Sequence, residues 1–174
     1  MDFAEHAGAA ARFRICFVCT GNICRSPMAE VIMRDLAAKA SLSSVLSVSS
    51  AGTGEWHVGE RADPRTIDAL HDHGYDRRHH RARQFDPAWF ADLDLVVALD
   101  RGQERILRGW APTDDDRAKV TLLLGLDRDE RAIDVPDPYY SDPATFDRVL
   151  LMIEHACRAL FDQITPALRP APAP

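Results

Sequence analysis

Nine residues near the start of the chain, Cys-Thr-Gly-Asn-Ile-Cys-Arg-Ser-Pro at 19–27, combine a nucleophile with an anion-binding side chain. Five residues separate Cys19 from Arg25, enough for the backbone amides to wrap a tetrahedral oxyanion. The sulfur would lie below the central atom, and the guanidinium would bind two outer oxygens. Gly21 allows close backbone approach, and Asn22 tolerates a left-handed conformation. Because the amides and the arginine favour a thiolate, the spacing predicts a nucleophilic cysteine under a bound oxyanion.

The elements on either side of this string would position it. Residues 15–18 are apolar and predict a buried strand, whereas residues 28–39 are rich in helix formers. Ser26 is predicted as the N-cap of that helix and Pro27 as its first residue. A helix start presents unpaired amides and a partial positive charge. The loop is therefore predicted to be an anion site.

A cysteine and an arginine at this spacing occur by chance, and a lone cysteine is more often a buried structural thiol. The whole string between strand and helix, however, resembles the active-site loop of the low-molecular-weight protein tyrosine phosphatases. The resemblance implies that Cys19 is the nucleophile, that Arg25 binds the phosphate and that Ser26 bonds the sulfur. It also implies substrate or phosphate contacts for the remaining loop residues, which are Thr20, Gly21, Asn22, Ile23 and Cys24.

A phosphate ester attacked by a thiolate also needs an acid that protonates its leaving group, worth roughly 10²–10⁴-fold. Asp-Pro steps occur at 63, 86, 137 and 142, and each would ordinarily be a turn or helix cap. Helix starts account for 142 and are expected at 63 and 86, which leaves Asp137 without a structural role. Asp-Pro-Tyr-Tyr at 137–140 also matches the resembled family, which implies that Asp137 acts as general acid and then as base.

Aromatic residues on two loops predict a deep slot rather than an open dish. Tyr139 and Tyr140 follow the predicted acid, and Trp56 lies in a loop bounded by glycines. Such aromatics more often pack on their own loop, but the resemblance implies that these line a phosphotyrosine crevice. A slot walled by rings would stack on a phenyl phosphate and would be too deep for phosphoserine.

The resemblance also implies a supporting layer beneath the loop. Ser50 and His80 fit residues that hold Asn22 in its strained conformation. The histidines at 71, 73, 79 and 80 do not predict a metal site, because no carboxylate or cysteine completes a ligand set. The predicted reaction therefore uses no metal and no cofactor.

Alternating strands and helices predict an α/β fold. Further strands are expected at 45–49, 94–99 and 120–124, and further helices at 63–73, 101–108 and 143–164. The resemblance implies a four-stranded parallel doubly wound sheet with helices on both faces, and ligand loops follow the strand ends of such sheets. Cys16 in the first strand and Cys157 in the last helix are expected to be core residues.

Length and charge set the wider expectations. The 174 residues suit one domain, expected at 13–165, with loose termini at 1–12 and 166–174. A net charge of −6 argues against nucleic-acid binding. Without an apolar run long enough for a signal or a membrane span, we expect a cytoplasmic protein, or one exported without a signal. The expected partner is a tyrosine-phosphorylated protein, met by a monomer or weak dimer.

Three alternatives remain in view. Arsenate reductases of this fold need two further cysteines after the loop, and none lies between 24 and 157. Protein arginine phosphatases resemble this family but typically carry a threonine where this chain has Ile23. A catalytically dead phosphate-binding module would lack the nucleophile or the acid, and both are present here.

Overall fold

A four-stranded parallel sheet forms the centre of the protein in a computed structural model. The structure describes residues 13–76 and 79–168. Its strands run in the order β2-β1-β3-β4. They are β1 (Phe13–Cys19), β2 (Leu46–Gly52), β3 (Leu95–Ala98) and β4 (Val120–Leu122). The predicted α/β class and the four-stranded parallel sheet are confirmed.

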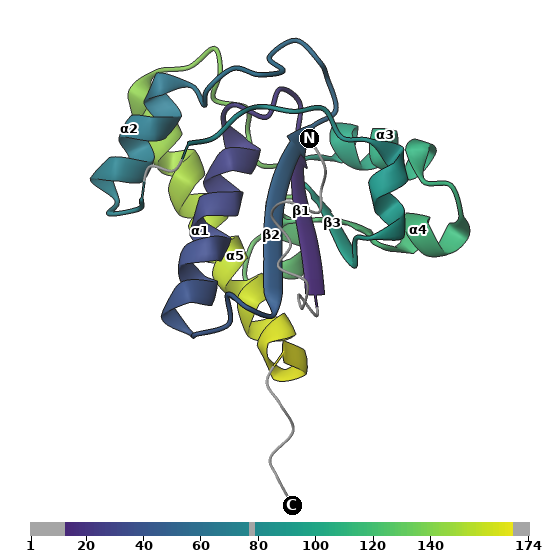
Figure 1. Ribbon diagram of the computed structural model, residues 1–174. Helices are drawn as coiled ribbons and strands as arrows, with labels where there is room; N and C mark the ends of the chain where they lie inside the picture. Colours follow the sequence, from purple (N-terminus) through teal and green to yellow (C-terminus); the bar gives the residue numbers. More distant parts are fainter. Residues whose placement is uncertain (1–12, 77–78, 169–174) are drawn as a thin grey trace, which may run out of the picture.

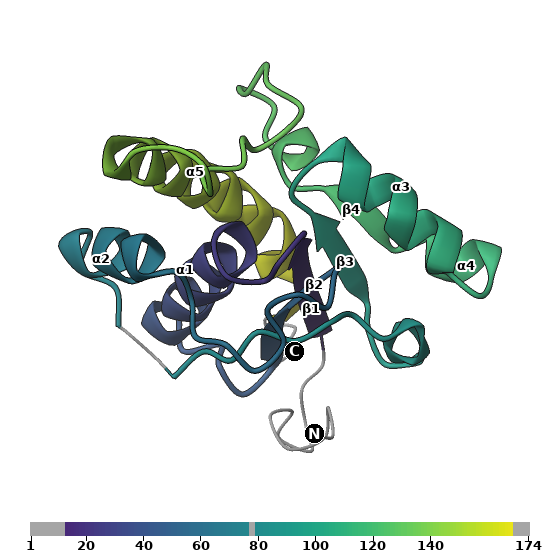
Figure 2. The ribbon, with the colours of Figure 1, turned by 90° about the horizontal axis from the view of Figure 1, so that it is seen from above.

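Helices cover both faces of this sheet (Figures 1 and 2). The α-helices are α1 (Arg25–Lys39), α2 (Pro64–Asp72), α3 (Arg101–Trp110), α4 (Asp114–Ala118) and α5 (Pro143–Leu168), and short 3₁₀ helices are η2 (Pro87–Ala91) and η3 (Leu124–Leu126). Seen from above, α1, α2 and α5 lie on one side of the sheet, and α3 and α4 lie on the other. The helices that connect the strands therefore lie on both faces of the sheet, as in doubly wound folds.

Each face of the sheet carries its own apolar core. Along β1, Ile15 and Phe17 pack with α1 and α5, whereas Cys16 and Val18 pack on the α3 side. This alternation follows from the two-residue period of a strand that is buried on both faces. Cys157 is fully buried in the α5 core, so the expectation of core positions for Cys16 and Cys157 is confirmed.

The start of α1 differs from the prediction. The helix begins at Arg25 with Cys24 at the N-cap and without a side-chain cap, so Ser26 is not the cap but the second helical residue. Pro27 is accordingly the third residue rather than the first. Its missing N–H still costs nothing, because the amides of the first turn have no partner within the helix. The hydroxyl of Ser26 is thereby released for contacts with the loop.

Other boundaries shift by a few residues. The strand predicted at 120–124 ends at Leu122 and passes into η3, and the short helix α4 was not predicted. Helix α5 continues past 164 to Leu168, which is buried. The termini expected to be loose were 1–12 and 166–174. Residues 166–168 are instead part of α5, and the rest lies outside the described residues, so the domain limits stay predictions.

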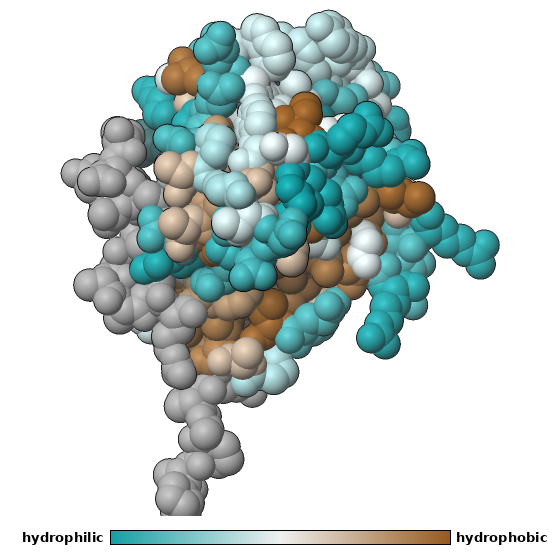
Figure 3. Space-filling model, turned by 90° about the vertical axis from the view of Figure 1, so that its right-hand side faces the viewer, coloured by the Kyte–Doolittle hydropathy of each residue, from teal (hydrophilic) through white to brown (hydrophobic). Residues whose placement is uncertain are grey.

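The surface on the α3 and α4 side is mixed. Hydrophilic and weakly polar side chains cover most of it, and apolar side chains gather toward its lower part in Figure 3. Among the described residues, no helix is both long enough and apolar enough to cross a membrane.

Candidate active site

The predicted nucleophile lies at the end of β1, where the chain turns into α1. Cys19 is 2% exposed, and its Sγ lies 3.0 Å from Oγ of Ser26. That hydroxyl also lies 3.2 Å from the carbonyl oxygen of Ala51. It has a single proton for two acceptors, and an ionised sulfur is the stronger of the two. Ser26 is therefore placed to stabilise a thiolate at Cys19.

The loop backbone owes its shape to Asn22. This buried residue has a φ of 56°, in the left-handed region that costs most residues energy. Its side-chain amide donates to Oγ of Ser26 at 2.8 Å and to Oγ of Ser50 at 2.9 Å. The carbonyl oxygen of Asn22 lies 2.6 Å from Nε2 of His80, and Oδ1 of Asn22 accepts from the amide of Arg83 at 3.0 Å. Ser50 and His80 thus contact the residue that the sequence assigned to them, and Arg83 was missed.

The end of β2 supports the loop from below, which the sequence did not indicate. The amides of Thr53 and Gly54 donate to the carbonyl oxygens of Cys19 and Thr20, each at 2.9 Å. A Cβ on Gly52 would come within 2.6 Å of the carbonyl oxygen of Thr20. Only glycine allows this approach of two backbones. These two hydrogen bonds fix the start of the phosphate loop against the segment that follows β2.

Arg25 is buried at the centre of the site. Its Nη1 donates to Asp100 at 2.8 Å and to the carbonyl oxygen of Val135 at 2.9 Å, and its Nη2 donates to Asp137 at 3.2 Å. Burial disfavours the charged form, but the charges of Cys19 and Asp137 and the bond to Asp100 outweigh it and raise the pKa of Arg25. The guanidinium is therefore a permanent positive charge beside the sulfur.

Asp100 is a site residue that sequence reasoning missed. It is the N-cap of α3 and forms a capping box with Gln103. Nε2 of Gln103 donates both to Oδ2 of Asp100, at 2.7 Å, and to Oγ1 of Thr20, at 3.0 Å. The signal was available, because Asp-x-x-Gln directly after an apolar strand is a helix start at the ligand-binding edge of a parallel sheet.

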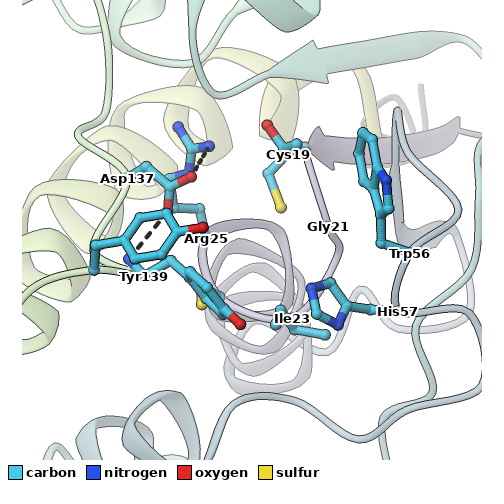
Figure 4. Close-up of a pocket in the computed structure, with 11 residues that line it drawn as sticks. Cys19, Gly21, Ile23, Arg25, Trp56, His57, Asp137 and Tyr139 are labelled. Carbon is cyan, nitrogen blue, oxygen red and sulfur yellow. Dashed lines mark hydrogen bonds and ion pairs between the residues drawn. The ribbon is translucent and has the colours of Figure 1, made fainter.

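Asp137 lies across the pocket from Cys19, as Figure 4 shows. Its Oδ2 contacts Arg25, and its Oδ1 accepts from the amide of Tyr139 at 3.2 Å. Half of its side chain is exposed. The structure thus brings the predicted acid to the rim of the loop that carries the predicted nucleophile.

A cavity of about 330 Å³ opens above the sulfur. Its lining residues are Cys19, Thr20, Gly21, Ile23, Cys24, Arg25, Trp56, His57, Asp137, Tyr139 and Tyr140. Tyr139 and Tyr140 pack edge to face at 4.8 Å, and both Trp56 and Tyr140 are largely exposed. The three predicted aromatics therefore do line one cavity, as rim residues with open faces.

His57 belongs to the same wall but was not predicted. Its ring lies over Gly21, where an added Cβ would come within 2.9 Å of the imidazole. Its Nδ1 lies 2.7 Å from Glu60, and its ring centre lies 6.0 Å from that of Tyr139. The only signal in the sequence was its position directly after Trp56 on a glycine-bounded loop.

The second loop cysteine, Cys24, lies in a buried environment that disfavours its ionisation. Burial, helped by the negative charges of Asp63 and Cys19, raises the pKa of Cys24 to about 12. Cys24 is therefore a thiol at neutral pH. Within the part of the chain that the structure describes, no group of three or more histidine, cysteine or acidic side chains is arranged to hold a metal ion.

Known proteins share this fold and sequence. Residues 14–169 match the family model of the low molecular weight phosphotyrosine protein phosphatases. A low molecular weight protein-tyrosine-phosphatase of Streptomyces coelicolor is 53% identical over 150 residues, covering 85% of this chain and 91% of that protein. The crystal structure of YfkJ from Bacillus subtilis superposes with a TM-score of 0.85 at 36% identity, covering 93% of this chain and all of YfkJ.

A more distant neighbour differs in its substrate. A structure of the YwlE arginine phosphatase, a Bacillus subtilis protein, has a TM-score of 0.80 at 26% identity and covers 90% of this chain and all of that one. The family model and the much closer relatives agree with one another, however, and so does the loop at 19–27. The chain belongs to the low-molecular-weight protein tyrosine phosphatases, the cysteine-based and metal-independent enzymes that hydrolyse phosphotyrosine.

Proposed function

We propose that Cys19, Arg25 and Asp137 carry out phosphotyrosine hydrolysis in two steps. The Cys19 thiolate attacks phosphorus while the loop amides and Arg25 bind the equatorial oxygens, and Asp137 protonates the departing phenol. Asp137 then deprotonates the water that hydrolyses the phosphocysteine. Splitting the reaction lowers each barrier, and the preorganised charges stabilise both transition states. The observation that carries this proposal is that all three residues line the same cavity.

The contacts of Arg25 support the order of events. Its Nη2 is paired with Asp137, while Asp100 and Val135 hold its Nη1. A bound phosphate dianion competes with Asp137 for Nη2. Release from Arg25 leaves the Asp137 side chain free to approach the oxygen of the departing phenol.

The aromatic rim supports phosphotyrosine as the substrate side chain. Trp56 and Tyr140 are exposed at the rim of a cavity whose floor is the Cys19 sulfur, and the partly buried ring of Tyr139 adds to its wall. An aryl phosphate can stack on these rings while its phosphorus reaches the floor. Ile23 adds an apolar contact from the loop itself.

We infer further that the enzyme acts on tyrosine-phosphorylated proteins in a reducing compartment such as the cytoplasm, as a monomer or weak dimer. All four cysteines are free and buried. The Cys19 thiolate must stay reduced to act, which suits such a compartment. Gel filtration across a range of protein concentrations tests the state of association.

Turnover of an aryl phosphate by the intact protein and by Cys19→Ser tests the function. We expect a burst of phenol ahead of steady turnover in the parent and no turnover in Cys19→Ser. A phosphate-binding module would give no turnover in either protein. Turnover of a phosphoarginine substrate in a parallel assay would indicate an arginine phosphatase instead. Reduction of arsenate in the presence of a thiol reductant would indicate an arsenate reductase.

A further inference from the structure

Arg65, in the first turn of α2, is tied to its own helix cap. Its Nε donates to Oδ1 of Asp63 at 3.0 Å, and its Nη2 donates to Oδ2 of Asp63 at 2.8 Å. Asp63 is also the N-cap that accepts the amide of Arg65. These bonds lower the pKa of Asp63 and raise that of Arg65, so both groups are charged at neutral pH.

The same guanidinium reaches across to the segment that carries the proposed acid. Its Nη2 donates to the carbonyl oxygen of Tyr139 and its Nη1 to that of Ser141, each at 3.0 Å. The guanidinium also lies over the ring of Phe146 in α5, 4.4 Å from its centre. Four hydrogen bonds and a cation–π contact thus leave one planar group with little freedom.

Asp63 completes a path to the phosphate loop. Its amide donates to the carbonyl oxygen of Ile23 at 2.9 Å. The contacts therefore run from Ile23 through Asp63 and Arg65 to Tyr139 and Ser141. In this way one side chain joins the loop of the nucleophile to the loop of the acid.

Other tertiary hydrogen bonds of residues 137–141 are few. Among the described residues, the remaining one is the contact between Asp137 and Arg25. The proposed mechanism breaks that contact when phosphate takes over Arg25. At that moment Arg65 supplies the hydrogen bonds that keep the segment over the pocket.

We propose that Arg65 is a positioning residue that holds the Asp137 segment in register with the phosphate loop. The inference rests on the proposed function, because it concerns the delivery of the Asp137 proton. Removing the guanidinium should also lower the free energy of unfolding, because the Asp63 side chain is only 8% exposed and loses its partner. The effect on catalysis must therefore be measured by a ratio that folding does not change, and it should be substantial because small misplacements of a catalytic group are costly.

The leaving group supplies a readout that a merely structural role does not change. Phenyl phosphate needs an acid to release its basic phenol, whereas a nitrophenyl phosphate needs it much less. The ratio of kcat/KM on the two substrates reports on the steps up to phenol release and is independent of how much enzyme is folded. Arg65→Leu should lower kcat/KM on phenyl phosphate about tenfold or more relative to the nitrophenyl ester.

Two further variants sharpen the comparison. Arg65→Lys should fall between parent and Arg65→Leu, because one ammonium cannot reproduce a fork that spans a carboxylate and two carbonyls. Arg108→Leu is the matched control, since Arg108 likewise joins a carboxylate, Glu104, to a backbone carbonyl, that of Val120, away from the pocket. Its ratio should equal that of the parent.

A double variant and a direct measurement complete the test. In an Asp137→Asn background, Arg65→Leu should cause no further change in the ratio, because both changes remove the same proton transfer. Amide hydrogen exchange at Tyr139 and Ser141 should be faster in Arg65→Leu and unchanged in Arg108→Leu.

The outcomes separate this inference from the function on which it rests. An equal loss on both esters with unchanged exchange at Tyr139 and Ser141 would overturn the positioning role. If Asp137→Asn itself leaves the ratio unchanged, the acid has been misassigned. The amide exchange rates of Tyr139 and Ser141 then decide alone. Faster exchange in Arg65→Leu supports the positioning role of Arg65, and exchange at the parental rate overturns it.

Discussion

Oδ2 of Asp100 lies 2.8 Å from Nη1 of Arg25, a side chain that is only 2% exposed. The carboxylate is thus the partner of a buried positive charge, and it approaches a different nitrogen from the one that contacts Asp137. Breaking a buried pair by removing one charge is costly, because the other charge is left without compensation. Asp100 therefore controls where the guanidinium lies when phosphate enters.

Asp100→Asn should lower kcat/KM about tenfold or more on every aryl phosphate, whatever its leaving group. In the proposed mechanism Arg25 binds the phosphoryl group, which all these substrates share. The asparagine side chain can still cap the helix, but it carries no charge. Asp134→Asn is the control, because Asp134 pairs instead with Arg101 on the surface. A loss confined to poor leaving groups would contradict this role and would place Asp100 with the acid.

Asp137→Asn should show the opposite dependence. Its kcat/KM on phenyl phosphate should fall roughly 10²–10⁴-fold, while kcat/KM on a nitrophenyl ester should be affected much less. Inorganic phosphate should inhibit the variant at least as well as the parent, because Arg25 no longer has to leave a carboxylate. Equal turnover of phenyl phosphate by parent and variant would show that another group is the acid.

The sequence predicted the elements of this site better than their connections. The apolar run at 15–18, the helix formers that follow it and the Asp-Pro-Tyr-Tyr string, together with the family resemblance, predicted one site for Cys19, Arg25 and Asp137, and these residues line one cavity. Local patterns also placed Asp63 at a helix start, which the structure shows as the cap of α2. These features depend on near neighbours in the chain, and propensity and spacing report on near neighbours.

The missed residues depend on contacts across the fold. Asp100 meets Arg25 from 75 positions away, and Arg65 meets Tyr139 from 74 positions away. Such contacts depend on the strand order, which the sequence pattern alone left open. The N-cap expected at Ser26 failed for a related reason: its hydroxyl bonds Asn22 and the sulfur of Cys19, and this tertiary network outweighs a local capping preference.

Ile23→Thr should raise phosphoarginine activity relative to phosphotyrosine activity. Ile23 lines the cavity beside the aromatic rim and offers an alkyl surface that suits a phenyl ring. A threonine hydroxyl can hydrogen-bond a guanidinium, and isoleucine cannot. Ile23→Val keeps the alkyl surface and should keep the parental ratio of the two activities. An unchanged ratio in Ile23→Thr would remove this residue from the account of specificity.

His80 should make the fold sensitive to mild acid. Burial lowers the pKa of His80, against the opposing pull of its bond to Asn22 and of Glu30. The unfolded chain then binds more protons below about pH 6.5, so the free energy of unfolding falls as the pH falls, by at most about 1.4 kcal/mol per unit. In urea unfolding, the free energy of unfolding should fall less between pH 7 and pH 5 for His80→Gln than for the parent.

The exposed neighbour His79 offers the control for that experiment. His79→Gln should keep the parental difference between the two pH values. If the free energy of unfolding falls equally in His80→Gln and His79→Gln between the two pH values, the partly buried imidazole of His80 is not the source of the sensitivity.

Mild peroxide should inactivate the enzyme reversibly through Cys24. The Cys19 thiolate is oxidised to a sulfenic acid, which condenses with the Cys24 thiol to form a disulfide and release water. Further oxidation of Cys19, which no thiol reverses, is thereby avoided. Because burial raises the pKa of Cys24 to about 12, little of it is thiolate at pH 7, and bridging should become more efficient toward pH 9.

After peroxide and then dithiothreitol, the parent should recover most of its activity and Cys24→Ser little. Cys157→Ala, which removes a thiol in the α5 core instead, should recover like the parent. Equal recovery of the parent and Cys24→Ser would show that Cys24 only packs beneath the loop.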